Sequence, residues 1–386
     1  MIKVNKKIVF LSIVAFGFAY VSGGNLPYSI FYMVLITIVL GMCYMHIANK
    51  NIHAKFKYDS RFYNVSDSTS ISIIVENLGL IPIPYVYVKS KVLSQLIDGY
   101  QGDLVFLGLN NNKWITTKIF FKKRGVYDFG HISIETNDLF NIFKSRKNIY
   151  NKLKIIVYPK VYDLSDVNLT GRHSYENLIN SKSGIDDFTL IKDIRKYNVG
   201  DNLKKVHWKL SAKHGEMYVK NFDSISGKEC NLLVNMHNNN LRNDVSEIIE
   251  EDMVDFSVSL TKYMMNARIK TRLFIHAKEQ KNIEVEFKDD FTGVMEYFLK
   301  SKSDATTDFS NFIKLNLRHI PKGNWIGVIS ITIDDNLRDT LMNLKKMGYK
   351  INLFYHGNSL HESENINLLK NLGIECIRFK EIIEGR

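Results

Sequence analysis

Hydrophobic and polar positions follow three successive patterns along the chain. Two uncharged apolar runs, residues 8–20 and 29–48, come first, with turn-forming residues between them. Short runs alternate apolar and polar side chains from residue 54 to 160, and residues 229–380 alternate apolar strand-like runs with helical periodicity. We therefore expect a helical, a β and an α/β region, in that order.

The first region has the features of a membrane anchor. Residues 29–48 reach the roughly 20 residues that a spanning helix needs, and the first run does so only if Gly23 and Gly24 are counted. Gly-Gly, Asn and Pro favour a tight turn between the runs. Residues 1–57 hold six lysines and no carboxylate, and no lysine lies between the runs. The positive-inside rule predicts a multi-pass cell-membrane protein with a transmembrane helical hairpin at 1–52 and the bulk of the chain in the cytoplasm.

Two alternatives stay open for this region. In one, the lysines at positions 3, 6 and 7 and the first apolar run form a secretory signal peptide, cleaved near residues 22–24. Such a cleavage leaves a very short tail before the second run. In the other, the runs form a buried soluble helix pair, although about 40 uncharged residues in a row are more than an ordinary core helix pair holds.

Charge and cysteine usage narrow the functional classes. The net charge is +12, from 52 Lys and Arg against 40 Asp and Glu, and half of it flanks the apolar region. This distribution is typical of membrane topology and gives no reason to expect a nucleic-acid partner. Cys43, Cys230 and Cys376 are far apart, so neither a disulfide framework nor a structural zinc site is expected.

The alternating region, residues 53–160, predicts a small β-sandwich. The strands are expected at 70–75, 84–88, 113–122, 126–129 and 131–134. This domain is either purely structural or a spacer and partner-binding module.

Residues 229–386 predict an open, mostly parallel sheet with helices on both faces, whose ligands would bind at the carboxyl ends of the strands. The strands are expected at 231–236, 271–275, 325–331, 351–355 and 374–379, with helices at 337–347 and 365–372. An earlier helix has an apolar face of Ile249, Met253, Phe256, Leu260 and Tyr263.

A distinctive motif lies in the connecting segment, residues 161–228. Its characteristic positions are Arg195, Tyr197, Gly200, Asp201, His207, Trp208, Lys209 and Ser211. Arg195, Asp201 and Lys209 are expected to form ion pairs between domains, with Trp208 filling a packing hole beside them.

This motif resembles the signature of the "domain of unknown function 58" family. Residues 124–127 and 138–143 also look like pieces of that family, although its usual Asp-Pro-Phe-Gly is here Asp138-Leu139-Phe140-Asn141. Lysines stand at 205 and 213, where the family more often has arginine. The resemblance implies a membrane-linked protein with a von Willebrand factor type A-like C-terminal part and a MoxR-type AAA+ ATPase as partner. The motif residues would then either join the domains or dock a partner.

The metal site typical of a von Willebrand factor type A domain is degenerate in this chain. There the first strand ends in Asp-x-Ser-x-Ser, and the aligned positions here are Asn235, His237 and Asn239. Mg²⁺ prefers hard anionic oxygen ligands, so we expect neither a metal nor a cofactor at this site.

The leading hypothesis is a non-enzymatic, membrane-anchored interaction or assembly protein. The chain contains no GxSxG, P-loop, HExxH or Gly-rich dinucleotide motif. Two alternatives remain: a hydrolytic enzyme of unknown substrate, and a structural envelope protein outside the cytoplasm.

Overall fold

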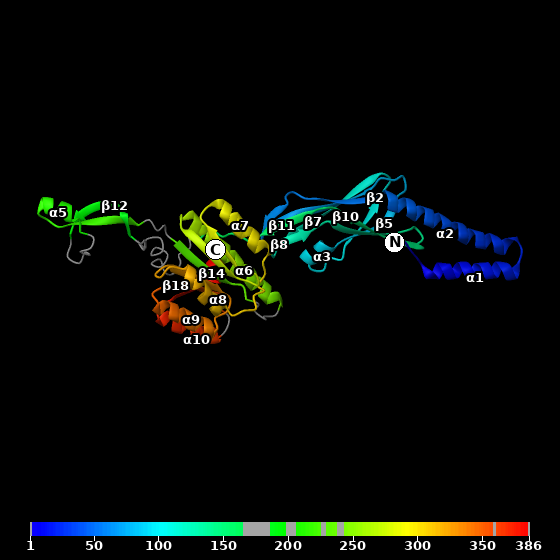
Figure 1. Cartoon of the computed structure of the whole chain (residues 1–386). Coiled ribbons are helices and arrows are strands. Elements are labelled where there is room, and N and C mark those ends of the chain that lie inside the picture. Colours follow the sequence, from blue (N-terminus) through cyan, green and yellow to red (C-terminus); the bar gives the residue numbers. More distant parts are fainter. Residues whose placement is uncertain are drawn as a thin grey trace. The chain divides into compact units, whose positions relative to one another are not determined.

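The computed structural model is multidomain, as the three sequence patterns predicted. It describes residues 2–164, 186–197, 206–224, 229–237, 243–357 and 360–384. The chain divides into two compact units, Met1–Tyr158 and Pro159–Arg386 (Figure 1).

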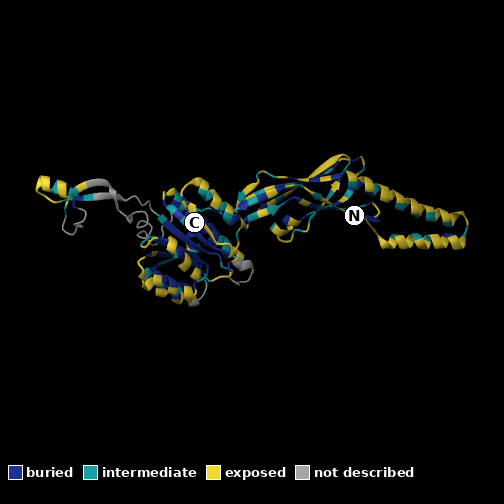
Figure 2. Cartoon of the chain, viewed as in Figure 1, coloured by how far each residue is buried: buried dark blue, intermediate teal, exposed yellow. Residues whose placement is uncertain are grey.

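Two helices, α1 (Lys6–Ser22) and α2 (Asn25–Asn51), begin the first unit. They are joined at Gly23 and Gly24, whose φ angles of 56° and 84° favour glycine. The rings of Phe16 and Phe31 lie 5.4 Å apart, so the helices pack against each other. Most of their side chains are exposed (Figure 2). Among the described helices, α2 is long and apolar enough to cross a membrane, which by itself is weak support for membrane association.

Antiparallel strands form most of the rest of the first unit. The five-stranded sheet has the order β1 (Ile2–Val4), β10 (Phe143–Tyr150), β9 (His131–Asn137), β5 (Ile83–Ser90) and β6 (Asp103–Leu107). A second sheet contains β2 (Ile52–Lys57), β4 (Ser68–Asn77) and β7 (Asn111–Phe120). A third contains β3 (Phe62–Asn64), β11 (Lys154–Tyr158) and β8 (Gly125–Asp128), and α3 (Lys91–Leu96) follows β5.

These sheets share one apolar core. Every second residue of β2 and β4 points into it, including Phe56 and Ile73, and so do Val86 of β5 and Ile134 of β9. This period of two is what the alternating sequence predicted. Strand β1 was not predicted, because three residues before a helix are too short to show alternation.

The second unit contains a six-stranded α/β sheet. Its order is β16 (Lys281–Val285), β15 (Lys270–His276), β14 (Glu229–Asn235), β17 (Trp325–Ser330), β18 (Lys350–Tyr355) and β19 (Glu375–Arg378). All neighbours are parallel except β16. The helices are α6 (Asn243–Asn266), α7 (Lys288–Lys300), α8 (Phe309–Asn316), α9 (Asp335–Lys346), α10 (Leu360–Asn371) and α11 (Phe379–Glu384).

Both faces of this sheet are buried. Leu232 and Val234 of β14 belong to the core cluster that includes residues of α6 and α7, and Leu233 belongs to the cluster with residues of α8 and α9. Figure 2 shows the strands as the buried layer. The last predicted strand ends one residue early, because Phe379 begins α11.

The described part of the connecting segment forms a separate two-stranded sheet. Strand β12 (Asp186–Lys196) pairs with β13 (Tyr218–Ser224), and helix α5 (Trp208–His214) precedes β13. The alternation of apolar and polar residues over 206–211 therefore belongs largely to a helix. Gly215 ends α5 in the left-handed conformation, with φ 72°.

Candidate functional site

A polar cavity of about 300 Å³ lies at the carboxyl ends of β14 and β17. From β14 the chain continues to β15, which pairs with one edge of β14, and it later returns to β17, which pairs with the other edge. The direction of the strand order therefore reverses at β14. Ligands of open α/β sheets bind at such reversal points. The polar lining side chains include Asn235, His237, Thr307, Asp308, Thr332 and Asp334.

Asn235 is the centre of a buried hydrogen-bond network. Its Oδ1 accepts from the backbone N–H of His237 at 3.2 Å and lies 3.1 Å from Nδ1 of His276. Its Nδ2 donates to Oγ of Ser330 at 3.0 Å, and that hydroxyl donates to the carbonyl of Thr332. One amide thus connects β14, β15 and β17.

These contacts determine the protonation of His276. Because Oδ1 of Asn235 is an acceptor, Nδ1 of His276 must carry the proton. The other ring nitrogen, Nε2, is then free to accept from the Thr307 hydroxyl at 2.8 Å. Burial, together with the nearby His237, lowers the pKa of His276 from 6.5 to about 4. His276 is therefore neutral at physiological pH.

The two carboxylates of the cavity hold helix N-termini. Oδ1 of Asp308 accepts from the Ser310 N–H at 3.0 Å at the start of α8. Oδ1 of Asp334 accepts from the Leu337 N–H at 2.8 Å at the start of α9. This N-capping gives both acids a structural role.

The degenerate metal positions fit this arrangement in part. Asn235 and His237 are in the cavity, but Asn239 lies outside the described residues. Within the described ranges, no group of three His, Cys, Asp or Glu side chains is arranged to hold a metal ion. The cavity is lined by hydrogen-bonding groups, and the most buried of them, Asn235, is already paired with His276 and Ser330.

Sequence reasoning did not identify His276, Ser330 or Thr307. His276 directly follows the predicted strand 271–275, and Asn235 is its Cα partner in the parallel register. If the two strands had been predicted to pair in parallel, the contact between Asn235 and His276 would have followed, because both residues lie at the carboxyl ends of their strands.

Three of the eight motif residues, Tyr197, His207 and Ser211, stabilise the fold of their own segment. The ring Nδ1 of His207 accepts from the Leu210 N–H at 3.1 Å and caps α5. Oγ of Ser211 accepts from the Tyr218 N–H at 2.9 Å, and the backbone N–H of Tyr197 donates to the Met217 carbonyl. Gly200 and Asp201 lie outside the described residues, so the expected Arg195–Asp201 ion pair does as well.

Trp208 and Lys209 point away from any core. Trp208 is 65% exposed, and Lys209 is exposed beside it on α5. The prediction that Trp208 fills a packing hole is therefore wrong. Arg195 on β12 is half-buried and donates from Nη1 to the carbonyl of Lys196 at 3.2 Å. The structure does not bring Arg195, Trp208 and Lys209 into one buried cluster.

Comparisons with known proteins match the segment that carries the motif. The family model described as "Protein of unknown function DUF58" matches residues 193–284, which include β13, β14 and α6. An uncharacterized protein named YeaD from Bacillus subtilis (strain 168) is 18% identical over 347 residues, covering 88% of this chain and 84% of that protein.

Solved structures show weaker likenesses. The CARDB domain of the PF1109 protein from Pyrococcus furiosus is 20% identical over 28% of this chain and 87% of that chain, with a TM-score of 0.20. A β-glucosidase from Listeria innocua is 12% identical over 26% of this chain and 16% of its own, with a TM-score of 0.14. Scores this low carry no argument about fold. The family match and the YeaD relative together support the DUF58 family for this chain.

Proposed function

We propose that the protein is a non-enzymatic, membrane-anchored interaction protein, with the bulk of its chain in the cytoplasm and a MoxR-type AAA+ ATPase as its partner. In this proposal α1 and α2 form the anchor, and the six-stranded sheet is a von Willebrand factor type A-like domain without its metal. The partner class comes from the family resemblance.

The strands next to the helices support a two-helix anchor. Strand β1 directly precedes α1 and pairs with β10, and β2 directly follows α2 and pairs with β4. Both ends of the helix pair therefore belong to the same β domain, on one side of any membrane the helices enter. The lysines at both ends favour the cytoplasmic side. Signal-peptide cleavage near residue 22 would remove β1 from its sheet.

The sheet and its cavity support the non-enzymatic, metal-free part of the proposal. A short antiparallel edge strand beside five parallel strands is compatible with a von Willebrand factor type A-like domain. At the reversal point, the Asn235 amide stands where such a domain has a carboxylate. One oxygen each of Asp308 and Asp334 caps a helix, which gives both acids a structural role.

The exposure of Trp208 is the observation that carries the interaction hypothesis. Large exposed aromatic side chains are enriched at protein interfaces, where Trp and charged neighbours supply much of the binding energy. Here His207 and Ser211 hold the helix, and Trp208 and Lys209 are left on its surface. The motif thus builds a small rigid element that presents an aromatic and a cationic side chain.

Affinity purification from the native membrane tests this proposal. The detergent-solubilised protein is captured with and without Trp208→Ala, and bound proteins are identified by mass spectrometry. Trp114→Ala, at another exposed tryptophan, is the matched control. We expect an AAA+ ATPase with wild type and control and its loss with Trp208→Ala. Recovery of the same proteins with all three chains would contradict a docking role for Trp208.

A further inference from the structure

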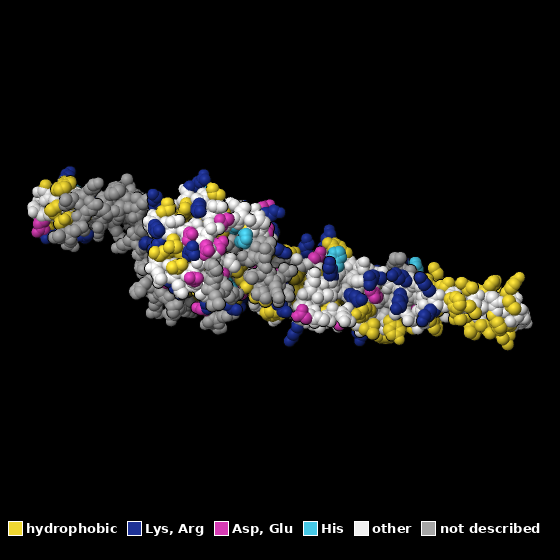
Figure 3. Space-filling view, turned by 90° about the horizontal axis from the view of Figure 1, so that it is seen from below, with side chains coloured by type: hydrophobic (Ala, Val, Ile, Leu, Met, Phe, Trp, Pro, Cys, Tyr) yellow, Lys and Arg dark blue, Asp and Glu magenta, His cyan; other side chains and the backbone are white. Residues whose placement is uncertain are grey.

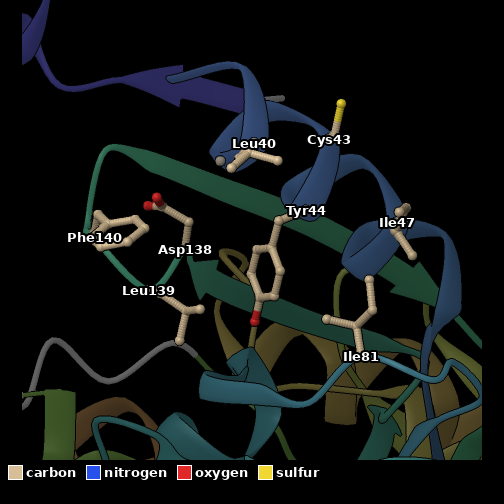
Figure 4. Close-up of a pocket in the computed structure, with 9 residues that line it drawn as sticks. Leu40, Cys43, Tyr44, Ile47, Ile81, Asp138, Leu139 and Phe140 are labelled. Carbon is tan, nitrogen blue, oxygen red and sulfur yellow. The ribbon is translucent and has the colours of Figure 1, made fainter. Parts of the chain in front are cut away.

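An apolar groove of about 380 Å³ lies between α2 and the turn that joins β9 to β10 (Figure 4). Helix α2 contributes Leu40, Tyr44 and Ile47, and the turn contributes Leu139 and Phe140. Leu40, Leu139 and Phe140 are each more than 60% exposed. The Tyr44 hydroxyl donates to the carbonyl of Pro82 at 2.7 Å, so it is already paired.

Besides the paired Tyr44 hydroxyl, the groove is lined by the carboxylate of Asp138, and one of its two oxygens lacks a hydrogen-bond donor. The residue is only 1% exposed. Its Oδ1 accepts from the Phe143 N–H at 2.8 Å, while Oδ2 is buried without a hydrogen-bond partner among the described atoms. A buried carboxylate oxygen without a donor is costly, and in a native protein it calls for an explanation such as a bound ligand.

Two backbone features shape the groove around Asp138. A Cβ on Gly41 would lie 3.1 Å from Oδ2 of Asp138 and 3.2 Å from the Phe143 ring, so glycine permits the close approach of α2. Asn141 has φ 55° and donates its N–H to the Asp138 carbonyl. Asparagine tolerates this left-handed conformation, so it can stand where the family has glycine.

The packing of α1 on α2 indicates the depth of the groove. Ile8 and Ile38 pack on the same small cluster of Met45, Ile142 and Phe143. The start of α1 therefore lies beside the same cluster as Ile38 and Tyr44 of α2. The stretch from Leu40 to Ile47 covers about 10 Å along α2 towards the β domain. In a two-helix anchor the groove lies at the end of α2 next to the β domain, where the headgroup region adds roughly 5–8 Å to the hydrocarbon.

We propose that this groove binds one phospholipid with a primary-amine headgroup, of the phosphatidylethanolamine type. The ammonium donates to Oδ2 of Asp138, and an acyl chain lies along Leu40 and Phe140. This inference rests on the membrane anchor of the proposed function and adds a lipid to it. A quaternary choline headgroup has the charge but no N–H to donate, and a glycerol headgroup has donors but no positive charge.

Exposed positive charge lies on β1 and β10, next to the start of α1. Lys144 directly follows the buried Phe143 on β10, so its side chain is on the other face of the strand, and its Cα partner in the sheet is Lys3. Both lysines are exposed. Figure 3 shows Lys and Arg side chains gathered where the apolar helices meet the rest of their unit.

Lipid retention tests the proposal on the full chain. The protein is reconstituted in nanodiscs of phosphatidylcholine mixed in equal parts with phosphatidylethanolamine or phosphatidylglycerol, then extracted, and the retained lipid is measured by native mass spectrometry. We expect selective retention of phosphatidylethanolamine, reduced about tenfold in Asp138→Asn by loss of one charge-assisted hydrogen bond. Asp98→Asn, at a highly exposed carboxylate of the same domain, should retain wild-type selectivity.

A second measurement does not depend on the folding of a variant at Asp138. Cys43 is exposed in the groove, whereas Cys230 is buried. In a Cys376→Ser background, maleimide labelling of Cys43 should be slower in phosphatidylethanolamine nanodiscs than in phosphatidylcholine alone. Equal labelling rates together with equal retention of all lipids would overturn the inference, as would crosslinking of Cys43 to a partner helix that fills the groove.

Failure of the inference and failure of the anchor give different results. If the wild-type chain does not sediment with membranes, the proposed anchor is wrong. If wild type and Asp138→Asn both sediment with membranes and neither selects the amine lipid, only the lipid site is wrong.

Discussion

The two units contain opposite kinds of buried polar centre. In the α/β unit, Asn235 has both its amide oxygen and its amide nitrogen paired, and His276 has a partner at each ring nitrogen. In the β unit, Asp138 has one oxygen paired and one unpaired. The first centre lies where open α/β sheets bind ligands, and the second lies beside an apolar helix.

The role of a buried polar group therefore depends more on whether its donors and acceptors are paired than on where the group lies in the fold. A fully paired network needs no ligand, because each desolvated group already has its partner. A buried carboxylate with one unpaired oxygen still lacks a hydrogen-bond donor, which a ligand can supply. The position where open α/β sheets bind ligands is thus filled by a structural network, and the turn between β9 and β10 carries the ligand candidate.

The largest expected effect is the loss of the Asn235 network. Asn235→Leu leaves the His276 Nδ1–H and the His237 N–H without an acceptor, and we expect a loss of about 3 kcal/mol in unfolding free energy. Urea unfolding followed through the fluorescence of buried Trp325, with Trp114 and Trp208 replaced by Phe, measures it. Asn336→Ala, at an exposed residue of the same cavity, should change stability by no more than about 0.5 kcal/mol. Similar losses in both variants would contradict the network.

Acid should act on the same centre. Because the pKa of His276 is lowered to about 4 in the folded chain, the unfolded chain binds a proton first as the pH falls below 6.5. The stabilisation is complete above pH 6.5 and is lost as the pH falls towards 4. We expect this component of the pH dependence, a slope of up to one proton, to vanish in His276→Gln and to persist in His319→Gln, at an exposed histidine. The same slope in both variants would assign the dependence to other groups.

A smaller effect is expected at the turn that shapes the groove. Asn141→Val places a β-branched residue at φ 55° and should cost about 1–2 kcal/mol. Asn141→Gly should be tolerated, because glycine adopts that conformation without strain. Thermal unfolding of the detergent-solubilised chain distinguishes them, and equal melting temperatures for the two variants would argue against the left-handed turn.

The smallest stability effect belongs to the proposed docking residue. Trp208→Ala should change unfolding free energy by no more than about 0.5 kcal/mol, since the side chain is 65% exposed. Urea titration checks this before any loss of partner is interpreted. A large destabilisation would mean that Trp208 packs against the fold after all, and the interaction hypothesis would lose its main support.

Sequence patterns predicted most strands and helices because period two and period 3.6 record burial directly. Leu232, Leu233 and Val234 could be assigned to a buried strand from composition alone. The patterns missed β1, which is short, and α11, which replaces the end of a predicted strand. They also did not predict several further elements, among them strands β2, β3, β6, β10 and β16 and helices α3, α7 and α8. They also missed the contact of His276 with Asn235 and the unpaired Oδ2 of Asp138. Both depend on which residues meet in three dimensions, and the spacing of residues along the chain does not record this. Trp208 was misjudged because a tryptophan is apolar enough for either a core or an interface.

The most direct test of the contrast between paired and unpaired centres is the melting temperature of Asp138→Asn and wild type in two membranes. In phosphatidylcholine nanodiscs, removal of an unpaired buried charge should raise the melting temperature of the β domain above that of wild type. When half of the lipid is phosphatidylethanolamine, wild type should gain the missing donor, and the difference should shrink or reverse. An equal lowering by Asp138→Asn in both membranes would contradict the account, because Oδ2 would then have a partner within the protein.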